Sequence, residues 1–476
     1  MTSPLHQQDS WLQQMNAGKR CFQHGDLRGA ARAFSRATKL QPERAESWVN
    51  LGSALLQSGL LDDAEEALKT ALALNPRLMT THMLLGDTRR MLGRSDESLR
   101  HYEQAVALDR SPAALNKLAC ALRARLQARD AEALYSEAIR RAPNFTLARV
   151  NLATLQLEAG KFTAAREQLQ ALQGAKLAPA EQAEVASARL ALAECERLEG
   201  ALTALVDSAD TAPLRAALAE LPRPLRRVDE AALAGVPQYL ASARELANHP
   251  AVELQPLPAE WPWVEAAFAV GLASDVEQYR AARKTLSARG DRDERQQLWL
   301  NMESLLRAAR HCREDMQAPL DAEVQLRHWH ALACRGVDGY RPGHFKYTRN
   351  WSAESPLQKR VDPPLASATF QHFMAQHYLQ LRPGLTRAAV LLMVLTDLLC
   401  FDDGNGRVAL TWMNRELEWA GLMPALLPSE LGLQGNMGQA MRAVRAQDGN
   451  LSPLLAVLTR GQAFARELCD ELDGAG

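Results

Sequence analysis

Residues 51–76 read LGSALLQSGLLDDAEEALKTALALNP. A Leu-Gly pair opens this stretch, Gly59 falls inside it and Pro76 closes it. Between these points the apolar residues recur every three or four positions, which is the spacing of an amphipathic helix. Glycine commonly ends a helix, and proline stops the one that follows. The stretch therefore predicts two helices that meet near Gly59.

The same pattern recurs along the N-terminal part of the chain. FSRATKLQP (34–42), LKTALALNP (68–76) and YSEAIRRAP (135–143) align, and repeats start near residues 11, 45, 79, 112 and 146. A small residue lets the two helices of each repeat approach closely; it is Gly18, Gly52, Gly86, Ala119 or Ala153. This pattern resembles the tetratricopeptide family over residues 11–179. The resemblance implies a helical solenoid of five units.

Arrays of this kind wrap a concave groove that holds a peptide or a partner helix. We therefore expect a protein or peptide partner for residues 11–179. The groove-facing candidates are Asn50, Asn116 and Asn151, whose amides suit the backbone of a bound peptide. Two alternatives stay open: the array is only a spacer, or these asparagines are solvated surface residues.

Length and composition bound the rest of the chain. Its 476 residues exceed what one core accommodates, so two or three domains are expected. The net charge of −1 offers nothing that would attract nucleic acid or an anionic membrane. The longest apolar run, residues 388–401, is too short for a bilayer and contains Asp397, so it predicts a buried helix. We expect neither nucleic acid nor a membrane as partner, and the sequence leaves the oligomeric state open.

The cysteines and the N-terminus indicate a compartment. Seven cysteines are scattered without a CxxC pair or zinc spacing, which favours free thiols and the cytoplasm. The first residues, MTSPLHQQDS, are polar and lack the apolar segment of a secretory signal. Secretion by a signal-independent route is the open alternative.

A second informative stretch is residues 398–410, LLCFDDGNGRVAL. We predict an apolar helix that ends at Phe401, a glycine-rich turn and a second helix that begins near Arg407. Backbone N–H groups at such a helix start can bind an anion. Arg407 adds a forked cation for phosphate, and Asp403 adds an oxygen ligand for magnesium. The alternative is an ordinary helix–helix turn, because Asp-Gly and Asn-Gly are common turn pairs.

Residues 325–425 resemble the Fic (Fido) family. Three segments match the family in order: one that begins at His330, the flap-like stretch from Gly343 to Trp351, and Pro363-Pro364. Residues 399–410 then align with the family signature HPFxDGNGRxxR. The resemblance implies transfer of AMP from ATP to a protein hydroxyl, with Mg2+ and ATP or another nucleotide as cofactors. It assigns magnesium to Asp403 and phosphate to the loop that carries Gly404, Asn405, Gly406 and Arg407. The flap, with Gly343, Phe345, Lys346 and Tyr347, would align a target segment.

Two departures bear on that activity. Leu399 stands where the family has its catalytic histidine, and a leucine cannot accept a proton, so general-base help of about 10²–10⁴-fold is lost. Leu410 stands where the family has a second phosphate-binding arginine. His344, His372, His377 and Asp402 are the candidates for a replacement base. A shorter stretch, CERLEG (195–200), is similar to an inhibitory motif of the family, with Cys195 in place of Ser or Thr.

The sequence as a whole predicts a mainly all-α protein. A tetratricopeptide solenoid (11–179) precedes a helical middle region (180–320) and a helical Fic-like domain (321–470) with a short β-hairpin flap. The favoured function is a scaffold whose Fic-like domain binds a nucleotide or another phosphate ligand without ordinary histidine-dependent AMP transfer. One alternative is a divergent transferase that moves AMP or another phosphate-linked group onto a protein or small-molecule hydroxyl. The other is a structural interaction protein with a relict loop.

Overall fold

A computed structural model describes residues 4–206, 210–286, 293–337, 341–347, 360–428 and 435–473. The chain divides into two compact units. The first comprises residues 1–156 and 163–189, and the second comprises residues 157–162 and 190–476. Helices are the main secondary structure of the described residues, whose only β-type pairing is a single antiparallel bridge between Glu253 and Leu422. The all-α prediction is confirmed.

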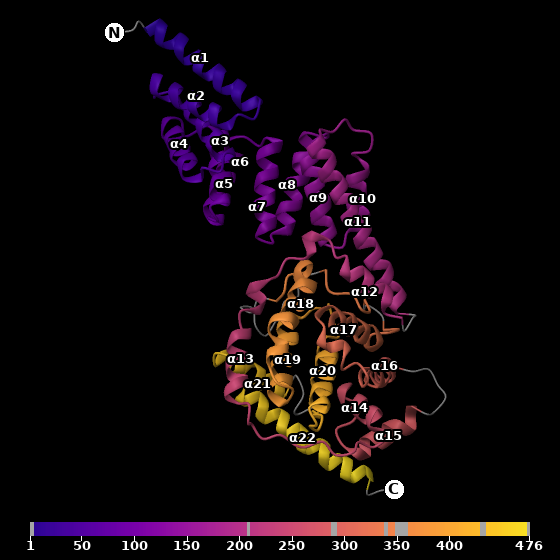
Figure 1. Ribbon diagram of the computed structural model, residues 1–476. Coiled ribbons are helices and arrows are strands. Elements are labelled where there is room, and N and C mark those ends of the chain that lie inside the picture. The colour runs from indigo at the N-terminus through magenta and orange to yellow at the C-terminus, as the bar shows by residue number, and fades with distance from the viewer. Residues whose placement is uncertain are drawn as a thin grey trace. The chain divides into compact units, whose positions relative to one another are not determined.

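The first unit is a stack of antiparallel helix pairs (Figure 1). Its helices are α1 (Pro4–Gln23), α2 (Leu27–Leu40), α3 (Ala45–Gln57), α4 (Leu61–Leu74), α5 (Met79–Met91), α6 (Ser95–Leu108), α7 (Pro112–Ala124), α8 (Ala128–Arg141), α9 (Thr146–Glu158) and α10 (Phe162–Gln170). The predicted repeat starts at residues 45, 79, 112 and 146 coincide with the starts of α3, α5, α7 and α9. The first pair begins earlier than predicted, at Pro4. The repeat period is therefore correct.

The glycines of the repeats do the two jobs that the sequence predicts. A Cβ on Gly18, Gly52 or Gly86 would lie 2.5 Å from the ring or side chain of the second helix of its own pair. Gly25, Gly59, Gly93 and Gly160 take positive φ and end the first helices. In the fourth pair Leu126 occupies the corresponding left-handed position, with φ 63°. That conformation costs roughly 1–2 kcal/mol in a residue with a Cβ, so this turn is strained relative to the others.

The second unit packs most of its helices around one large apolar core. Its helices are α11 (Pro179–Leu205, whose first part belongs to the first unit), α12 (Ala212–Ala219), α13 (Val236–Glu245), α14 (Trp261–Ala269), α15 (Val276–Leu286), α16 (Glu294–Ala309), α17 (Pro319–Ala333), α18 (Ala366–Gln376), α19 (Leu385–Leu398), α20 (Asn405–Trp419), α21 (Asn436–Ala446) and α22 (Ser452–Asp473). α11 and α12 pack with α17 in a smaller apolar cluster. Short 3-10 turns cover Arg223–Leu225, Glu230–Leu233, Asp315–Gln317, Pro363–Leu365 and Tyr378–Gln380. The core runs from Leu233 to Leu472, so the predicted middle region shares it with the C-terminal helices.

α19 and α20 form an antiparallel pair at the centre of the second unit (Figure 1). α19 is buried almost all round, as the apolar run 388–401 predicts, and Asp397 within it is paired with Tyr239 and Arg445. Charged residues buried in this core are likewise paired. Arg387 binds Glu416, and Arg415 binds Glu265, with closest approaches of 2.6 Å in both cases. These pairs satisfy charges that would otherwise be costly to bury.

Two details of the predicted second unit need correction. The described residues 341–347 form a turn and extended backbone without a strand, so they do not make the predicted β-hairpin; residues 348–351 lie outside the described part. α19 ends at Leu398 and α20 begins at Asn405, rather than at Phe401 and Arg407. The turn is therefore shifted toward the N-terminus, because Leu399 leaves the helix in a left-handed conformation with φ 46°.

Candidate functional site

A groove runs along the first helices of the repeats. Its first compartment, of about 680 Å3, takes residues mainly from α3 and α5, and its second, of about 440 Å3, takes them from α5, α6 and α7. Asp87 and Lys117 line both compartments and form an ion pair of 2.8 Å where the two meet. The hydroxyl of Tyr102 donates to the same Asp87 at 2.7 Å. Three repeats thus build one continuous groove with a fixed polar cluster at its middle.

The predicted asparagines lie at or beside this groove. Asn50 lines the first compartment and Asn116 the second, while Asn151 donates from Nδ2 to Asn116 Oδ1 at 3.0 Å. Within the described part of the chain, the side-chain amide of Asn50 has no hydrogen-bond partner. The amide of Asn50 is therefore placed to bond a peptide, whereas the Asn151 amide is partly committed to its neighbour. Their role in binding stays a prediction.

The loop between α19 and α20 is held by its own asparagine. Asn405 Oδ1 accepts the Phe401 N–H at 2.9 Å, and Asn405 Nδ2 donates to the Phe401 carbonyl at 2.8 Å. Gly404 precedes α20 with φ 74°, and Asp403 Oδ1 accepts the Gly404 N–H at 2.6 Å. Both Asp402 and Asp403 are exposed, while Asn405, Gly406 and Arg407 are half-buried. The predicted phosphate-binding residues therefore share one ordered helix start.

His330 of α17 packs against this loop and hydrogen-bonds to it. Its Nδ1 accepts the Gly343 N–H at 2.9 Å, so Nε2 carries the proton and donates to the Asp403 carbonyl at 3.0 Å. The ring stacks on Phe401, with centroids 3.8 Å apart. Burial lowers the pKa of His330 to about 3, so the ring is neutral. With both nitrogens engaged, His330 does not replace the proton acceptor that Leu399 lacks.

Cys334 and Gly404 complete the contact between α17 and the loop. A Cβ on Gly404 would lie 2.9 Å from His330 Nε2 and 3.0 Å from Cys334 Sγ, so the fit requires glycine. Arg407 Nη2 lies 3.9 Å from the Cys334 Sγ. Burial raises the pKa of Cys334 to about 11, which makes it a packing residue rather than a nucleophile. The sequence does not single out Cys334, although its i, i+4 spacing from His330 places the two residues on one side of α17.

The flap-like residues 343–347 pack against the same loop. The Lys346 N–H donates to the Cys400 carbonyl at 2.8 Å, and Lys346 Nζ donates to the Leu398 carbonyl at 3.3 Å at the end of α19. Burial lowers the pKa of Lys346 to about 8. Phe345 lies edge-on to Phe401 and under the Arg327 guanidinium. Lys346 is therefore a structural cap of α19, a role that the resemblance did not indicate.

Glu199 of α11 binds three side chains of this segment. Its carboxylate accepts from His344 Nε2 at 3.1 Å, from Arg341 Nη2 at 3.2 Å and from the Tyr347 hydroxyl at 3.3 Å. The hydrogen bond from His344 is the main cause that lowers the pKa of Glu199. Cys195, one turn earlier, is buried. The CERLEG stretch thus has a definite contact in the second unit, with residues 341–347 rather than with the loop 399–407.

The other candidate bases are not assembled at the loop. His344 is engaged by Glu199 and by the Pro342 carbonyl, and Leu399 is half-buried at the end of α19 rather than on a helix face. His372 and His377 pack against each other at the far end of α18, with centroids 5.8 Å apart. Asp402 is exposed beside Asp403. Within the described ranges no group of three or more His, Cys, Asp or Glu side chains could hold a metal ion. Magnesium at Asp403 would thus depend on ligands from a bound phosphate.

Comparison with known proteins identifies the first unit. Residues 16–79 and 116–181 match the family model described as Tetratricopeptide repeat. The N-terminal array therefore consists of tetratricopeptide repeats. The Fic resemblance of residues 325–425 gains no support from these comparisons, and no curated protein matches the chain.

Solved structures are similar to part of the chain. The MamA protein is 25% identical over 36% of this chain and 97% of its own, with a TM-score of 0.31. TTC0263, a thermophilic TPR protein in Thermus thermophilus, is 24% identical over 38% and 99%, with a TM-score of 0.34. Pseudomonas aeruginosa pilF is 16% identical over 40% and 85%, with a TM-score of 0.36.

The structure also bears on compartment and membrane. All seven cysteines are free thiols. Among the described helices none combines the length and apolar character that crossing a bilayer requires. Localisation in the cytoplasm stays a prediction.

Proposed function

We propose that this protein is a recognition scaffold that holds a segment of a partner protein in the groove of its tetratricopeptide repeats. The observation that carries the proposal is the continuous groove along α3, α5 and α7, with half-buried Leu84 and Met83 in its floor and the Asn50 amide beside them. Apolar pockets that alternate with amides suit the side chains and backbone of an extended peptide.

Selection from a displayed library of random 12-residue peptides tests this proposal. The full-length chain should enrich a consensus that Leu84→Arg abolishes, because a charged side chain would fill the groove floor. Leu74→Arg is the matched control: Leu74 is 40% exposed on α4 and does not line the groove. Lack of enrichment by the wild-type chain, or equal enrichment by Leu84→Arg, would overturn the proposal.

A second function is proposed for the loop 399–407: it binds a nucleotide or another phosphate ligand without histidine-dependent transfer. In its favour, Asn405 fixes the loop, and the start of α20 presents Gly406 and Arg407 next to the exposed Asp403. The start of a helix attracts an anion. Magnesium bound to Asp403 would offset the negative charge of Asp402 and Asp403 beside a bound phosphate. Leu399 and the neutral, fully bonded His330 argue against transfer. A divergent transferase is the alternative.

Calorimetric titration with ATP and magnesium tests the loop. The wild-type protein should bind, and Asn405→Ala should not, because removal of the amide releases both hydrogen bonds to Phe401. Asn450→Ala, at a turn far along the chain, is the control and should bind as the wild type does. Absence of binding by the wild type would end the nucleotide proposal.

Labelling with radioactive ATP then separates a binder from a transferase. Label transferred by the wild-type protein would favour the divergent enzyme. Label that appears only in Leu399→His would indicate a site that is complete except for its base.

A further inference from the structure

The two compartments of the groove differ in chemistry. The first is lined by the apolar side chains Val49, Leu78, Met83 and Leu84. The second carries Arg90, Asn116, Lys117 and Arg125 with the hydroxyls of Ser95, Ser98 and Tyr102. The four apolar side chains of the first compartment can therefore take aliphatic side chains of a partner segment, and the arginines of the second can take polar or acidic ones.

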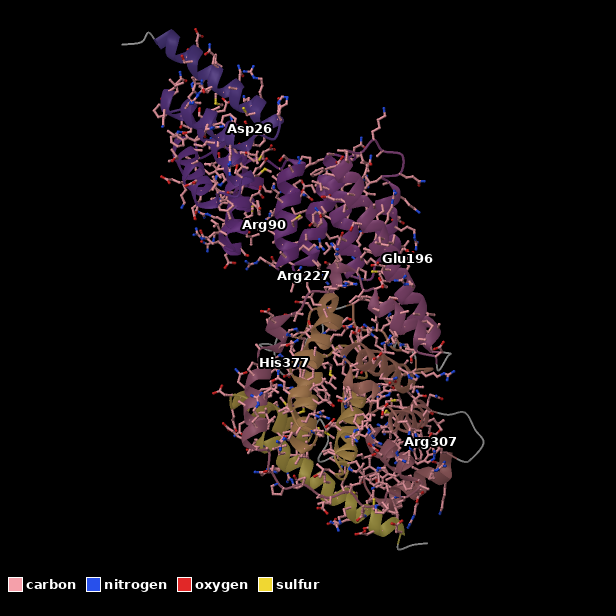
Figure 2. All side chains as sticks on the ribbon, viewed as in Figure 1. Asp26, Arg90, Glu196, Arg227, Arg307 and His377 are labelled. Carbon is pink, nitrogen blue, oxygen red and sulfur yellow. The ribbon has the colours of Figure 1, made fainter. Side chains whose placement is uncertain are left out.

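The charges of the lining side chains do not balance. Four cations line the two compartments, Arg44, Arg90, Lys117 and Arg125, against two acids, Glu46 and Asp87. Asp87 is satisfied by Lys117, and Glu46 by Lys19. Arg125 pairs with the exposed Asp96 outside the groove. The described ion pairs of the second compartment leave Arg90 without an acidic partner. Arg90 is exposed on α5 (Figure 2). Its side chain lies beside the Tyr102 hydroxyl.

Three other polar side chains of this compartment are already engaged. Ser98 donates to the Gly86 carbonyl at 2.7 Å, Tyr102 donates to Asp87, and Asn116 accepts from Asn151. These bonds fix three side chains of the walls, and the exposed Arg90 guanidinium beside the Tyr102 hydroxyl can reach an incoming segment. Arginine binds carboxylates through two parallel N–H donors, which makes the contact strong and selective.

We propose that the groove recognises an acidic, partly apolar protein segment, with aliphatic side chains in the Val49–Leu84 compartment and a carboxylate on Arg90. This inference rests on the proposed peptide-binding function and adds the chemistry of the partner. Association should weaken with salt, because the contact lies at an exposed arginine.

The peptides enriched from the random library provide the first test. Their consensus should combine Asp or Glu with Leu, Met or Val. A consensus without acidic residues would overturn this inference and leave peptide recognition intact, whereas an absence of enrichment would overturn both.

Fluorescence anisotropy with the best enriched peptide provides the second test. Replacing its acidic residues by glutamine should weaken binding about tenfold or more. Arg90→Glu should weaken binding of the acidic peptide to a similar extent. The same variant should bind a peptide whose acidic residues are replaced by lysine. Arg129→Glu, an exposed arginine of α8 outside the groove, should leave both unchanged. Equal affinity of Arg90→Glu and the wild type for the acidic peptide would overturn the inference.

Discussion

His330 joins three segments that are distant in the sequence. It bonds Gly343 on one side and Asp403 on the other, and it does so only while neutral, because Nδ1 must accept a hydrogen bond. The type and position of this residue are visible in the sequence, but they offer no reason to separate a structural histidine from a catalytic one. That distinction depends on burial and on the direction of two hydrogen bonds, which only the folded chain defines.

Acid should destabilise the second unit through His330. An ordinary histidine titrates near pH 6.5, and burial lowers the pKa of His330 to about 3. Between these values the unfolded chain binds a proton that the folded chain does not. The stabilising contribution is therefore complete above about pH 6.5 and is lost as the pH falls toward 3.

Thermal unfolding followed by tryptophan fluorescence between pH 7.5 and 5 measures this effect. His330→Gln, which can still donate to Asp403 and accept from Gly343, should lower Tm at pH 7.5 but reduce its dependence on pH. The same pH dependence in the variant and the wild type would contradict the assignment.

At the scale of the helix pair, Gly86 sets the distance between α5 and α6. A Cβ at this position would lie 2.5 Å from the ring of Tyr102, which is buried and tied to Asp87. Gly86→Ala should therefore lower the free energy of unfolding by about 1–3 kcal/mol, despite the better helix propensity of alanine.

Urea denaturation followed by circular dichroism checks this value. Gly200→Ala is the control, because its added methyl group meets nothing within 4 Å in α11 and should be neutral or slightly stabilising. A neutral Gly86→Ala would show that α5 and α6 separate without cost, as the pair with Ala119 and Tyr135 already accommodates a methyl group.

The elements were predictable where local chemistry defines them. The repeat period follows from small residues, left-handed glycines and terminal prolines, so four repeat starts are correct to the residue. The ends of α19 and α20 were misplaced because Leu399, with a Cβ, adopts the left-handed conformation that glycine usually takes. Residues 341–347 form no strand, and the Lys346 N–H makes a single backbone hydrogen bond to the loop, at the Cys400 carbonyl.

At the scale of the whole molecule, the sequence predicted the repeat array but not how the rest of the chain is divided. The pairs Glu265–Arg415 and Tyr239–Asp397 join the middle region to α20 and α19 across roughly 150 residues of sequence. Local periodicity carries no information on such contacts, so the boundary at residue 320 stays a prediction while the observed core extends across it.

The most direct test of the account is to locate a bound peptide on the full-length protein. A peptide selected from the library and carrying a photoreactive benzophenone is crosslinked, and the attachment sites are mapped by mass spectrometry. We expect attachment within residues 44–53, 75–90, 95–102 and 116–125, which line the groove. Attachment to α2, α4 or α8, or to the second unit, would contradict recognition in the groove.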